Sequence, residues 1–564
     1  MTYVPPVREQ RFLLRHIVRM DELAGPNAFA DATPDVVDAI VEGAGSFAVE
    51  EFAPLNRLGD QVGASWLPGG VTLPPGFKEA YGAYVANGWG SLAAPKHHGG
   101  QGLPFSLSSV VMEDLHSGNM AFALVTMLTS SAVEALGHHG SAEQKTTWLP
   151  KLVTGEWTGT MNLTEPQAGS DVGALKTKAE PIGDGTYRIS GGKIFITYGE
   201  HDLAENIVHF VLARTPDAPA GTKGISLFLV PKFLPGGGRN DVRCVSIEHK
   251  LGIRASPTCV MSFGDEGRCI GWLVGEECGG MRAMFTMMNS ARLSVGLEGV
   301  SIAERATQAA VAYAQQRVQG RRDGRPAAII EHPDVRRMLL RMKALTQGAR
   351  ALCYYAAGQV DRAALGDADA RLRLDLLTPL AKAYGTDIGV EVASLGIQVH
   401  GGMGFIEEAG AAQHYRDARI APIYEGTNGI QAADLVGRKI GLDGGAVLKS
   451  LLDDIRSSGF APLAELVERC AAISARLRAA SPDDALAAAY PFLTMLAVAT
   501  CGWLMARQLD ALDSDSDPAF AAAKRAAGLY YLEQLVPEAI GLAAQAGASA
   551  DLLYSIPPEG FDPA

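Results

Sequence analysis

The chain has few of the features that mark a metalloprotein, a secreted protein or a disulfide-bonded one. Its 564 residues include seven cysteines, no two of which have CxxC spacing, and no histidine cluster accompanies them. Zinc sites need such ligand groups, and a scattered, odd set of cysteines is typical of reduced cytosolic thiols. The N-terminus mixes arginines with short apolar pieces and lacks the apolar core of a secretory signal. We therefore expect a cytoplasmic protein with no metal site.

Positive charge is also scarce. The chain has 49 Lys and Arg against 62 Asp and Glu, which gives a net charge of −13. Nucleic-acid binding depends on clustered Lys and Arg, so this composition argues against a nucleic-acid partner. It leaves room for a local basic patch that binds an anionic cofactor. No internal repeat with a fixed period is present.

Long uncharged stretches are rare, and the clearest is 485–506. It is long enough to span a bilayer. Pro491, Thr494, Thr500, Gly502 and many alanines make it only moderately hydrophobic. We expect a buried helix here in preference to a membrane-spanning or membrane-facing one.

The character of the sequence changes several times along the chain. Residues 1–34 show no clear period and resemble an arm, whereas apolar residues recur at helical spacing in 35–157. Short β-prone runs separated by Gly and Pro turns fill 158–280, long helical patterns return in 281–445, and Ala- and Leu-rich helix follows in 446–564. We expect a multidomain α+β protein: an N-terminal helical domain, a middle antiparallel β-domain that is closed or sandwich-like, a C-terminal helical bundle and an extra helical extension.

Particular runs carry these expectations. The expected strands are 187–189, 194–196, 207–212, 225–230 and 259–263, and the clearest helices of the bundle are 303–317, 335–357 and 372–395.

One segment places a carboxylate between an aromatic residue and a glycine, just before a helix expected to run to about Lys439. This is Tyr424-Glu425-Gly426-Thr427. Burial raises the pKa of a carboxyl group and a helix N-terminus lowers it, and a general base needs such tuning. Taken alone, the segment is more typical of an exposed loop glutamate.

Three further segments support the general-base interpretation. They are Met161-Asn162-Leu163-Thr164-Glu165-Pro166-Gln167-Ala168-Gly169-Ser170-Asp171, Lys193-Ile194-Phe195-Ile196-Thr197 and Gln398-Val399-His400-Gly401-Gly402-Met403-Gly404-Phe405. With the Glu425 segment and an Arg-bearing helix between them, they resemble the acyl-CoA dehydrogenase family in order and spacing, over roughly residues 35–440. The C-terminal extension resembles that of the longer bacterial members, a group that includes the methylthiopropionyl-CoA dehydrogenases.

The resemblance implies a reaction. It is the FAD-dependent oxidation of an acyl-CoA thioester to its 2,3-enoyl form, with electrons passed to an electron-transfer flavoprotein. No side chain accepts hydride well, so this chemistry requires a flavin. The extension would cover surface that shorter relatives use to form tetramers, so the expected assembly is a homodimer. Membrane contact is not expected.

The resemblance also assigns residues. Glu425 would be the base, and its backbone N–H, with a flavin ribityl hydroxyl, would bond the thioester oxygen. Cofactor contacts are implied for Met161, Asn162, Leu163, Thr164, Phe195, Ile196, Thr197, Arg317, Gln398, Gly401, Gly402, Thr427 and Gly429. Substrate contacts are implied for Ser170, Asn289, Arg292 and Gly426. Of these, Arg317, Gln398, Gly401 and Gly402 would reach the flavin of the neighbouring subunit.

The chain departs from the family pattern at three of its positions. Phe195 stands where Trp is frequent, Gly320 where Phe is frequent, and Asn289 where Asp or Glu is frequent. Without the resemblance, Phe195 would be a core aromatic, Thr164 a strand residue and Arg317 a solvated helix residue.

Other functions compete with this one. An acyl-CoA oxidase would pass electrons to oxygen through the same residues. A third interpretation is a flavin-containing DNA-binding stress protein on the same scaffold, but Asp510, Asp513, Asp515 and Asp517 make the extension acidic, which repels DNA. Acyl chain length and branching are not set by these motifs, and 120–128 suits either a pocket wall or a core helix.

Overall fold

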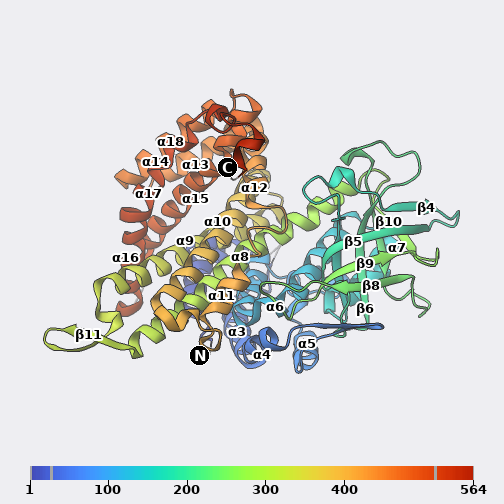
Figure 1. Cartoon of the computed structure of the whole chain (residues 1–564), viewed down its shortest axis with the longest axis horizontal. Helices are drawn as coiled ribbons and strands as arrows, with labels where there is room; N and C mark the ends of the chain where they lie inside the picture. Colours follow the sequence, from blue (N-terminus) through green and yellow to red (C-terminus); the bar gives the residue numbers. More distant parts are fainter. Residues whose placement is uncertain (1–2, 26–28, 513–516, 563–564) are drawn as a thin grey trace. The chain divides into compact units, whose positions relative to one another are not determined.

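The computed structural model describes residues 3–25, 29–512 and 517–562. Asp513 and Asp515 lie outside the described residues. The chain forms two compact units, Met1–Val7 with Phe29–Ser294, and Arg8–Ala28 with Val295–Ala564. Figure 1 colours the chain by residue number, from blue at the N-terminus to red at the C-terminus.

The first unit begins with helices. They are α3 (Pro34–Phe47), α4 (Ala53–Val62), α5 (Phe77–Ala86), α6 (Phe105–His139) and α7 (Ala142–Thr154). Ser141 and Gln144 form a reciprocal capping box at the start of α7. The α6 backbone leaves helical geometry at Asn119, whose side chain accepts the N–H of Phe122. All of 120–128 is buried, so this stretch is core helix.

A mixed sheet follows in the first unit. Its strands are β3 (Trp157–Asn162), β4 (Lys178–Pro181), β5 (Tyr187–Thr197), β6 (Asn206–Ala213), β7 (Ser226–Pro231), β8 (Val242–Ile247), β9 (Thr258–Phe263) and β10 (Ile270–Val274). The order is β3-β6-β7-β10-β5-β9-β8, with β4 beside β5. Ile189, Val211, Phe228, Val230 and Met261 form part of its buried core.

Two details of the predicted β-domain need correction. The domain is not wholly antiparallel, because β3 pairs in parallel with β6, with Met161 opposite Phe210. A long crossover through β4 and β5 separates these two strands, and parallel pairing requires such a crossover. The runs 187–189 and 194–196 belong to one strand, β5, whose pairing with β9 shifts register between Lys193 and Ile196.

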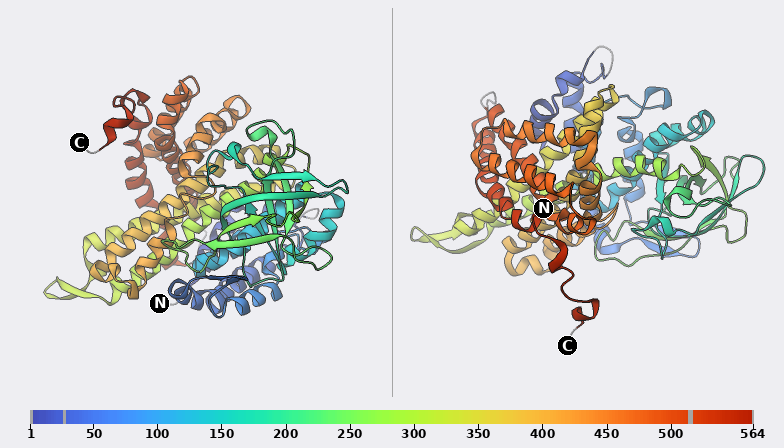
Figure 2. Two further views of the ribbon diagram at one scale, coloured as in Figure 1. Left: turned by 45° about the vertical axis from the view of Figure 1, so that its right-hand side comes forward. Right: turned by 90° about the horizontal axis from the view of Figure 1, so that it is seen from above.

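The second unit is helical. Its helices include α8 (Gly280–Gln316), which starts in the first unit, α9 (Pro333–Ala364), α10 (Ala368–His400), α11 (Ala411–Ala418), α12 (Asn428–Gly437), and the extension helices α13 (Ala446–Arg456), α14 (Ala461–Leu477), α15 (Pro482–Ala511), α16 (Pro518–Tyr530) and α17 (Val536–Ile540). A short hairpin, β11 (Val318–Arg322) and β12 (Arg325–Ala328), follows α8. The extension packs on the bundle, with α15 against α9, α10 and α12 (Figures 1 and 2).

Glycines bring α8 and α10 into backbone contact. A Cβ atom at Gly299 would lie 2.0 Å from the carbonyl oxygen of Gly385, and one at Gly385 would lie 2.6 Å from that of Gly296. Distances this short exclude any side chain, so the two helices cross on their backbones.

The N-terminal segment is not the arm that the sequence predicts. It contains α1 (Val7–Leu13) and α2 (Met20–Leu23), and most of it belongs to the second unit. The buried Lys524 on α16 forms an ion pair with the buried Glu9 at 2.7 Å, and Arg362 donates to the carbonyl oxygen of Val18 at 3.0 Å. These elements are too short to give a clear period in the sequence.

Among the residues that the structure describes, two helices are long and apolar enough to cross a membrane, α6 and α15. The apolar window of α6 is 78% buried inside the protein and that of α15 is 72% buried. Packing in the protein interior accounts for the apolar character of both. The expectation of a buried helix at 485–506 agrees with this packing.

Candidate functional site

Glu425 lies in a loop with unusual backbone geometry. Its φ is +55°, in the left-handed region, and that of Gly426 is +82°. A non-glycine residue in this region costs about 1–2 kcal/mol. The next residue, Thr427, caps α12 by accepting the N–H of Ile430 at 3.2 Å. The loop therefore presents Glu425 directly before a helix N-terminus, and the helix ends at Gly437, two residues before the predicted end.

A network of buried hydrogen bonds holds this loop in place. Lys382 of α10 is fully buried, and its Nζ donates to the carbonyl oxygen of Gly426 at 2.9 Å and to Oδ1 of Asn428 at 2.8 Å. The amide of Asn428 in turn donates to Oδ1 of Asp387 at 2.8 Å. Gln431 donates to the carbonyl oxygens of Glu425 and Gly426 at 3.3 Å each. Both carbonyl groups of the strained turn are thus fixed.

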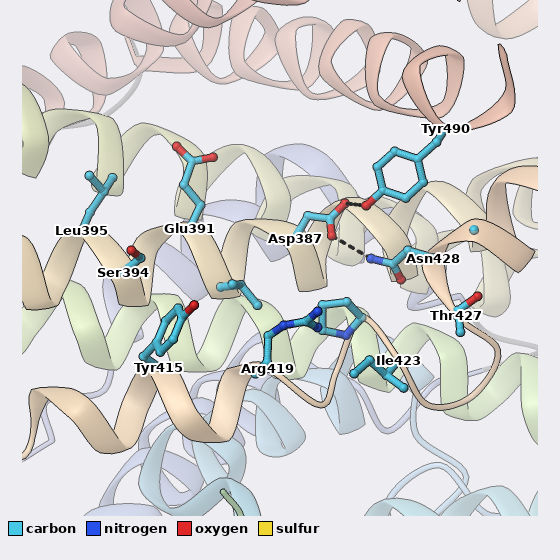
Figure 3. A pocket seen from close by; sticks show the side chains of 13 residues that line it. Asp387, Glu391, Ser394, Leu395, Tyr415, Arg419, Ile423, Thr427, Asn428 and Tyr490 are labelled. Atoms are coloured by element: carbon cyan, nitrogen blue, oxygen red, sulfur yellow. Dashed lines mark hydrogen bonds between the residues drawn. The ribbon is translucent and has the colours of Figure 1, made fainter. Parts of the chain in front are cut away.

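A pocket of about 650 Å³ opens beside the loop (Figure 3). It is lined by Asp387, Val390, Glu391, Ser394, Leu395, Tyr415, Arg419, Pro422, Ile423, Thr427, Asn428, Gly429 and Tyr490. Tyr490, from extension helix α15, donates to Oδ2 of Asp387 at 2.5 Å. Burial raises the pKa of Asp387, and the hydrogen bonds from Tyr490 and Asn428 oppose that rise.

The pocket is lined by some residues that the sequence predicted for the site and by others that it did not. Thr427 and Gly429 were predicted to bind cofactor, and both line it. Arg419 and Tyr490 were missed by the sequence reasoning. Arg419 precedes Glu425 by only six residues, and this closeness in sequence could have suggested it. Nothing in the sequence links Tyr490 to a segment so distant in the chain.

In the first unit, the end of β3 meets the bulged end of β5. Met161 and Asn162 are buried, and Leu163 and Thr164 are half-buried. The carbonyl oxygen of Leu163 accepts from Lys193 Nζ at 3.0 Å, and that of Thr164 accepts from the Ile194 N–H at 2.9 Å. Internal hydrogen bonds thus hold two of the residues that were predicted to contact the cofactor.

Phe195 differs from its neighbours in β5. Its side chain is 58% exposed and its φ is +60°, so the alternative of a core aromatic is wrong. Ile196 lies in the sheet core, and Thr197 is half-buried. The bulge turns Phe195 out of the alternation of the strand, as bulges often do at functional sites.

A buried ion pair beneath this segment was not predicted. Glu165 accepts from Lys193 Nζ at 2.8 Å, from the Thr177 hydroxyl at 2.6 Å and from the Lys176 N–H at 2.7 Å. Burial alone would raise the pKa of Glu165, but the charge of Lys193 and these hydrogen bonds outweigh it and hold that pKa at about 2.

The predicted substrate-binding residues are divided between a helix and loops. Asn289 and Arg292 share the first half of α8, where Arg292 is buried and donates to Oδ1 of Asn289 at 3.1 Å. Ser170 is exposed in the loop that follows β3. Gly426 lies in the Glu425 loop.

The four residues that were predicted to reach the flavin of a neighbouring subunit lie outside the pocket lining. Arg317 is exposed one residue beyond the end of α8, so the prediction that it lies on a helix is wrong; its N–H still closes the last turn on Tyr313. Gln398 is exposed on the last turn of α10, and Gly401 and Gly402 are exposed directly after it. They form an accessible glycine-rich turn with Gly401 at φ +59°.

A second carboxyl group near Glu425 was also missed. Glu298 of α8 is fully buried and accepts a hydrogen bond from the hydroxyl of Tyr424. Its sequence surroundings, Val295-Gly296-Leu297-Glu298-Gly299-Val300, are wholly apolar or glycine. A lone glutamate in such a run was the available signal.

Family models match the chain in four successive parts. The descriptions are "Acyl-CoA dehydrogenase, N-terminal domain" for residues 38–156, "Acyl-CoA dehydrogenase, middle domain" for 160–265, "Acyl-CoA dehydrogenase, C-terminal domain" for 279–440 and "Acetyl-CoA dehydrogenase C-terminal like" for 449–557. The last match covers most of the extension.

Individual proteins are similar over nearly the full length. The chain is 46% identical to the 3-methylmercaptopropionyl-CoA dehydrogenase of Ruegeria pomeroyi, over 95% of this chain and 97% of the relative. It is 34% identical to a butyryl-CoA dehydrogenase of Syntrophomonas wolfei, over 99% of each. The solved structure of an acyl-CoA dehydrogenase complexed with FAD from Bacillus anthracis has a TM-score of 0.75 at 21% identity, covering 93% of this chain and 89% of that one, which is a likeness of fold.

Proposed function

The chain belongs to the acyl-CoA dehydrogenase family, and from that premise we propose that Glu425 is the base that removes a proton from the carbon next to the thioester carbonyl. The protein is an acyl-CoA dehydrogenase and FAD is its cofactor. One observation carries the proposal for Glu425: a carboxylate is held at φ +55° before a helix N-terminus, by a network that fixes both carbonyl groups of its turn. Strain maintained in this way is typical of functional sites.

The pocket beside α12 suits the diphosphate of FAD. The N-terminus of α12 reaches the pocket at Thr427 and Gly429, and Arg419 on the pocket wall adds a guanidinium beside the carboxyl groups of Asp387 and Glu391. Helix N-termini and arginine are the groups that proteins use to bind phosphate. In this proposal Thr427 and Gly429 bind the cofactor of their own chain, while Arg317, Gln398, Gly401 and Gly402 bind that of a partner chain.

The segment around β3 and β5 would hold the flavin ring. Leu163 and Thr164 offer backbone groups and a hydroxyl, and Phe195 offers an exposed aromatic face. Met161, Asn162, Ile196 and Thr197 support this surface. The buried pair of Glu165 and Lys193 fixes the Leu163 carbonyl beneath it.

The reaction divides between the protein and the cofactor. Glu425 takes the proton from the α-carbon, and its backbone N–H donates to the thioester oxygen as negative charge grows there. When bound, FAD would supply the acceptor for the hydride of the β-carbon, which no side chain can provide. Gly426 leaves room for the thioester because it has no side chain. Ser170, Asn289 and Arg292 bind the coenzyme A part, with Arg292 suited to phosphate.

The substrate class we propose is a short, unbranched acyl-CoA thioester. Two relatives that cover nearly the whole chain are named for 3-methylmercaptopropionyl-CoA and butyryl-CoA. An electron-transfer flavoprotein is the proposed acceptor, and a cytoplasmic homodimer the proposed form. Light scattering tests the assembly, and a tetramer would contradict it.

Anaerobic absorbance spectroscopy tests the function. The purified protein is titrated with 3-methylmercaptopropionyl-, butyryl-, octanoyl- and palmitoyl-CoA, and bleaching of the flavin band by the first two is the expected result. Bleaching by none of them would contradict the proposal, and bleaching by the long chains alone would contradict the substrate class. Peroxide formation on admission of air, at the rate of turnover, would favour oxygen as the acceptor.

A further inference from the structure

Glu298 is a second carboxyl group close to the loop that carries Glu425. It stands on α8, fully buried, between Gly296 and Gly299, which hold that helix against α10. The hydroxyl of Tyr424 donates to its Oε2. Tyr424 is the residue before Glu425, so one hydrogen bond connects α8 with the strained turn that carries the base.

The groups that face Glu298 come from two other elements. Tyr424 and Glu425 approach from the loop before α12, and Lys382 approaches from α10. The Nζ of Lys382 donates to Gly426 and Asn428, so its charge is directed at the loop itself. An ionised carboxylate at Glu298 would thus be buried near a second carboxylate, which is costly.

These surroundings favour the protonated form of Glu298. Burial raises its pKa to about 8; the charge of Glu425 adds to the rise, and the Tyr424 hydrogen bond and the charge of Lys382 reduce it. Near neutral pH Glu298 is then uncharged, so it places no second negative charge beside Glu425.

The Tyr424 hydrogen bond also has a mechanical role. The left-handed backbone conformation of Glu425 is unfavourable in free energy. Contacts on both sides of the turn are needed to hold the residue in it. Lys382 and Gln431 fix the carbonyl groups at Glu425 and Gly426. The bond from Tyr424 to Glu298 fixes the side before the turn.

We infer that Glu298 is a positioning residue that acts as a neutral acid: it holds Tyr424, and through it Glu425, and leaves the negative charge of the site to Glu425 alone. The inference rests on the proposed function of Glu425. Ionisation of Glu298 at alkaline pH places two like charges beside one turn and displaces Glu425 from its working position.

Three variants of the holoenzyme test this inference: Glu298→Leu, Glu298→Gln and Tyr424→Phe. Leu removes the acceptor for Tyr424, so flavin reduction by acyl-CoA at pH 7 falls by roughly 10- to 100-fold, as expected for a misplaced base. Gln keeps an uncharged acceptor of the same shape and recovers most of that loss. Phe at position 424 slows reduction by a similar factor, and combining it with Leu adds little. A Leu variant as fast as the original chain would overturn the inference.

The pH profile separates positioning from a general structural role. In the original chain, the rate constant for flavin reduction falls above about pH 8, with the slope of one ionisation, at most roughly tenfold per pH unit. Glu298→Gln lacks that fall. An identical alkaline fall in both proteins would overturn the inference.

Infrared spectroscopy gives a readout that needs no turnover. The protonated carboxylic acid of Glu298 gives a carbonyl band that disappears from the original chain as pH rises through about 8 and is missing from Glu298→Gln at every pH. The exposed Glu559→Gln is the matched control and keeps the band. Absence of the band from the original chain at pH 7 would overturn the inference. If no acyl-CoA reduces the flavin in any variant, the proposed function fails, while the infrared result still decides the state of Glu298.

Discussion

The Nζ of Lys382 lies 2.9 Å from the carbonyl oxygen of Gly426, which ties the middle of a buried helix to the turn that carries Glu425. Replacing Lys382 with Met leaves that oxygen and Oδ1 of Asn428 without this donor. We expect a loss of about 3 kcal/mol in the free energy of unfolding, measured by urea denaturation. The matched control is Lys449→Met, a lysine 76% exposed on α13, which should change stability by less than about 0.5 kcal/mol. Equal effects of the two substitutions would contradict this account.

Glu425→Gln removes the base and keeps the shape of the side chain. We expect the protein to bind FAD and acyl-CoA as before, and the rate constant for flavin reduction to fall roughly 10³-fold. Stopped-flow absorbance measures the rate, and the visible spectrum reports the bound flavin. Turnover at the original rate would remove Glu425 as the base, and loss of the flavin would instead show a structural role.

Because of Glu165, the free energy of unfolding is expected to vary with pH in the acidic range. Its pKa in the folded protein is about 2, below the ordinary value of 4.5, so its stabilising contribution is present above pH 4.5 and is lost as pH falls toward 2. We expect up to about 3 kcal/mol of pH-dependent stability from this group. Glu165→Gln should flatten that dependence between pH 5 and 3 and should also destabilise the protein at neutral pH, because Lys193 stays buried. Urea denaturation at stepped pH measures both effects, and parallel pH curves for the two proteins would disprove the assignment.

Tyr490→Phe tests whether the extension contributes to cofactor binding. The substitution removes the hydrogen bond to Asp387 on the pocket wall. A hydrogen bond to a charged group contributes about 1.5–3 kcal/mol, so we expect FAD to bind roughly tenfold more weakly to the reconstituted apoprotein. Tyr554→Phe, at a side chain 71% exposed near the C-terminus, is the control. Fluorescence titration with FAD distinguishes them, and equal affinities would confine the extension to a structural role.

Local patterns predicted the elements well where burial imposes a clear period. The run 207–212 falls within β6, and 225–230 overlaps β7 from Ser226 onward, because these central strands are buried along their whole length. Long-range pairing was beyond such reasoning. The parallel pairing of β3 with β6 depends on the path of the chain between them, and the continuity of β5 depends on a bulge that lets Phe195 point outward.

The sequence also predicted only part of the candidate site. Glu425 and Thr427 stand in one short segment before a helix, so spacing alone brings them together. Lys382, Glu298 and Tyr490 come from α10, α8 and α15, and only tertiary packing brings them to the Glu425 loop. Glu298 stands out as a lone glutamate in an apolar run, but nothing in the sequence links it, Lys382 or Tyr490 to that loop.

The glycine crossing of α8 and α10 restricts how this enzyme can change by mutation. Glu298 is the neighbour of Gly299, and Lys382 lies one turn before Gly385, so the crossing sets the spacing between the buried acid and the buried ammonium group. Any single codon change that adds a side chain at Gly299 or Gly385 would push both helices apart and shift both groups at once. Selection for new acyl-CoA substrates is therefore expected to leave these two codons unaltered and to accumulate changes elsewhere.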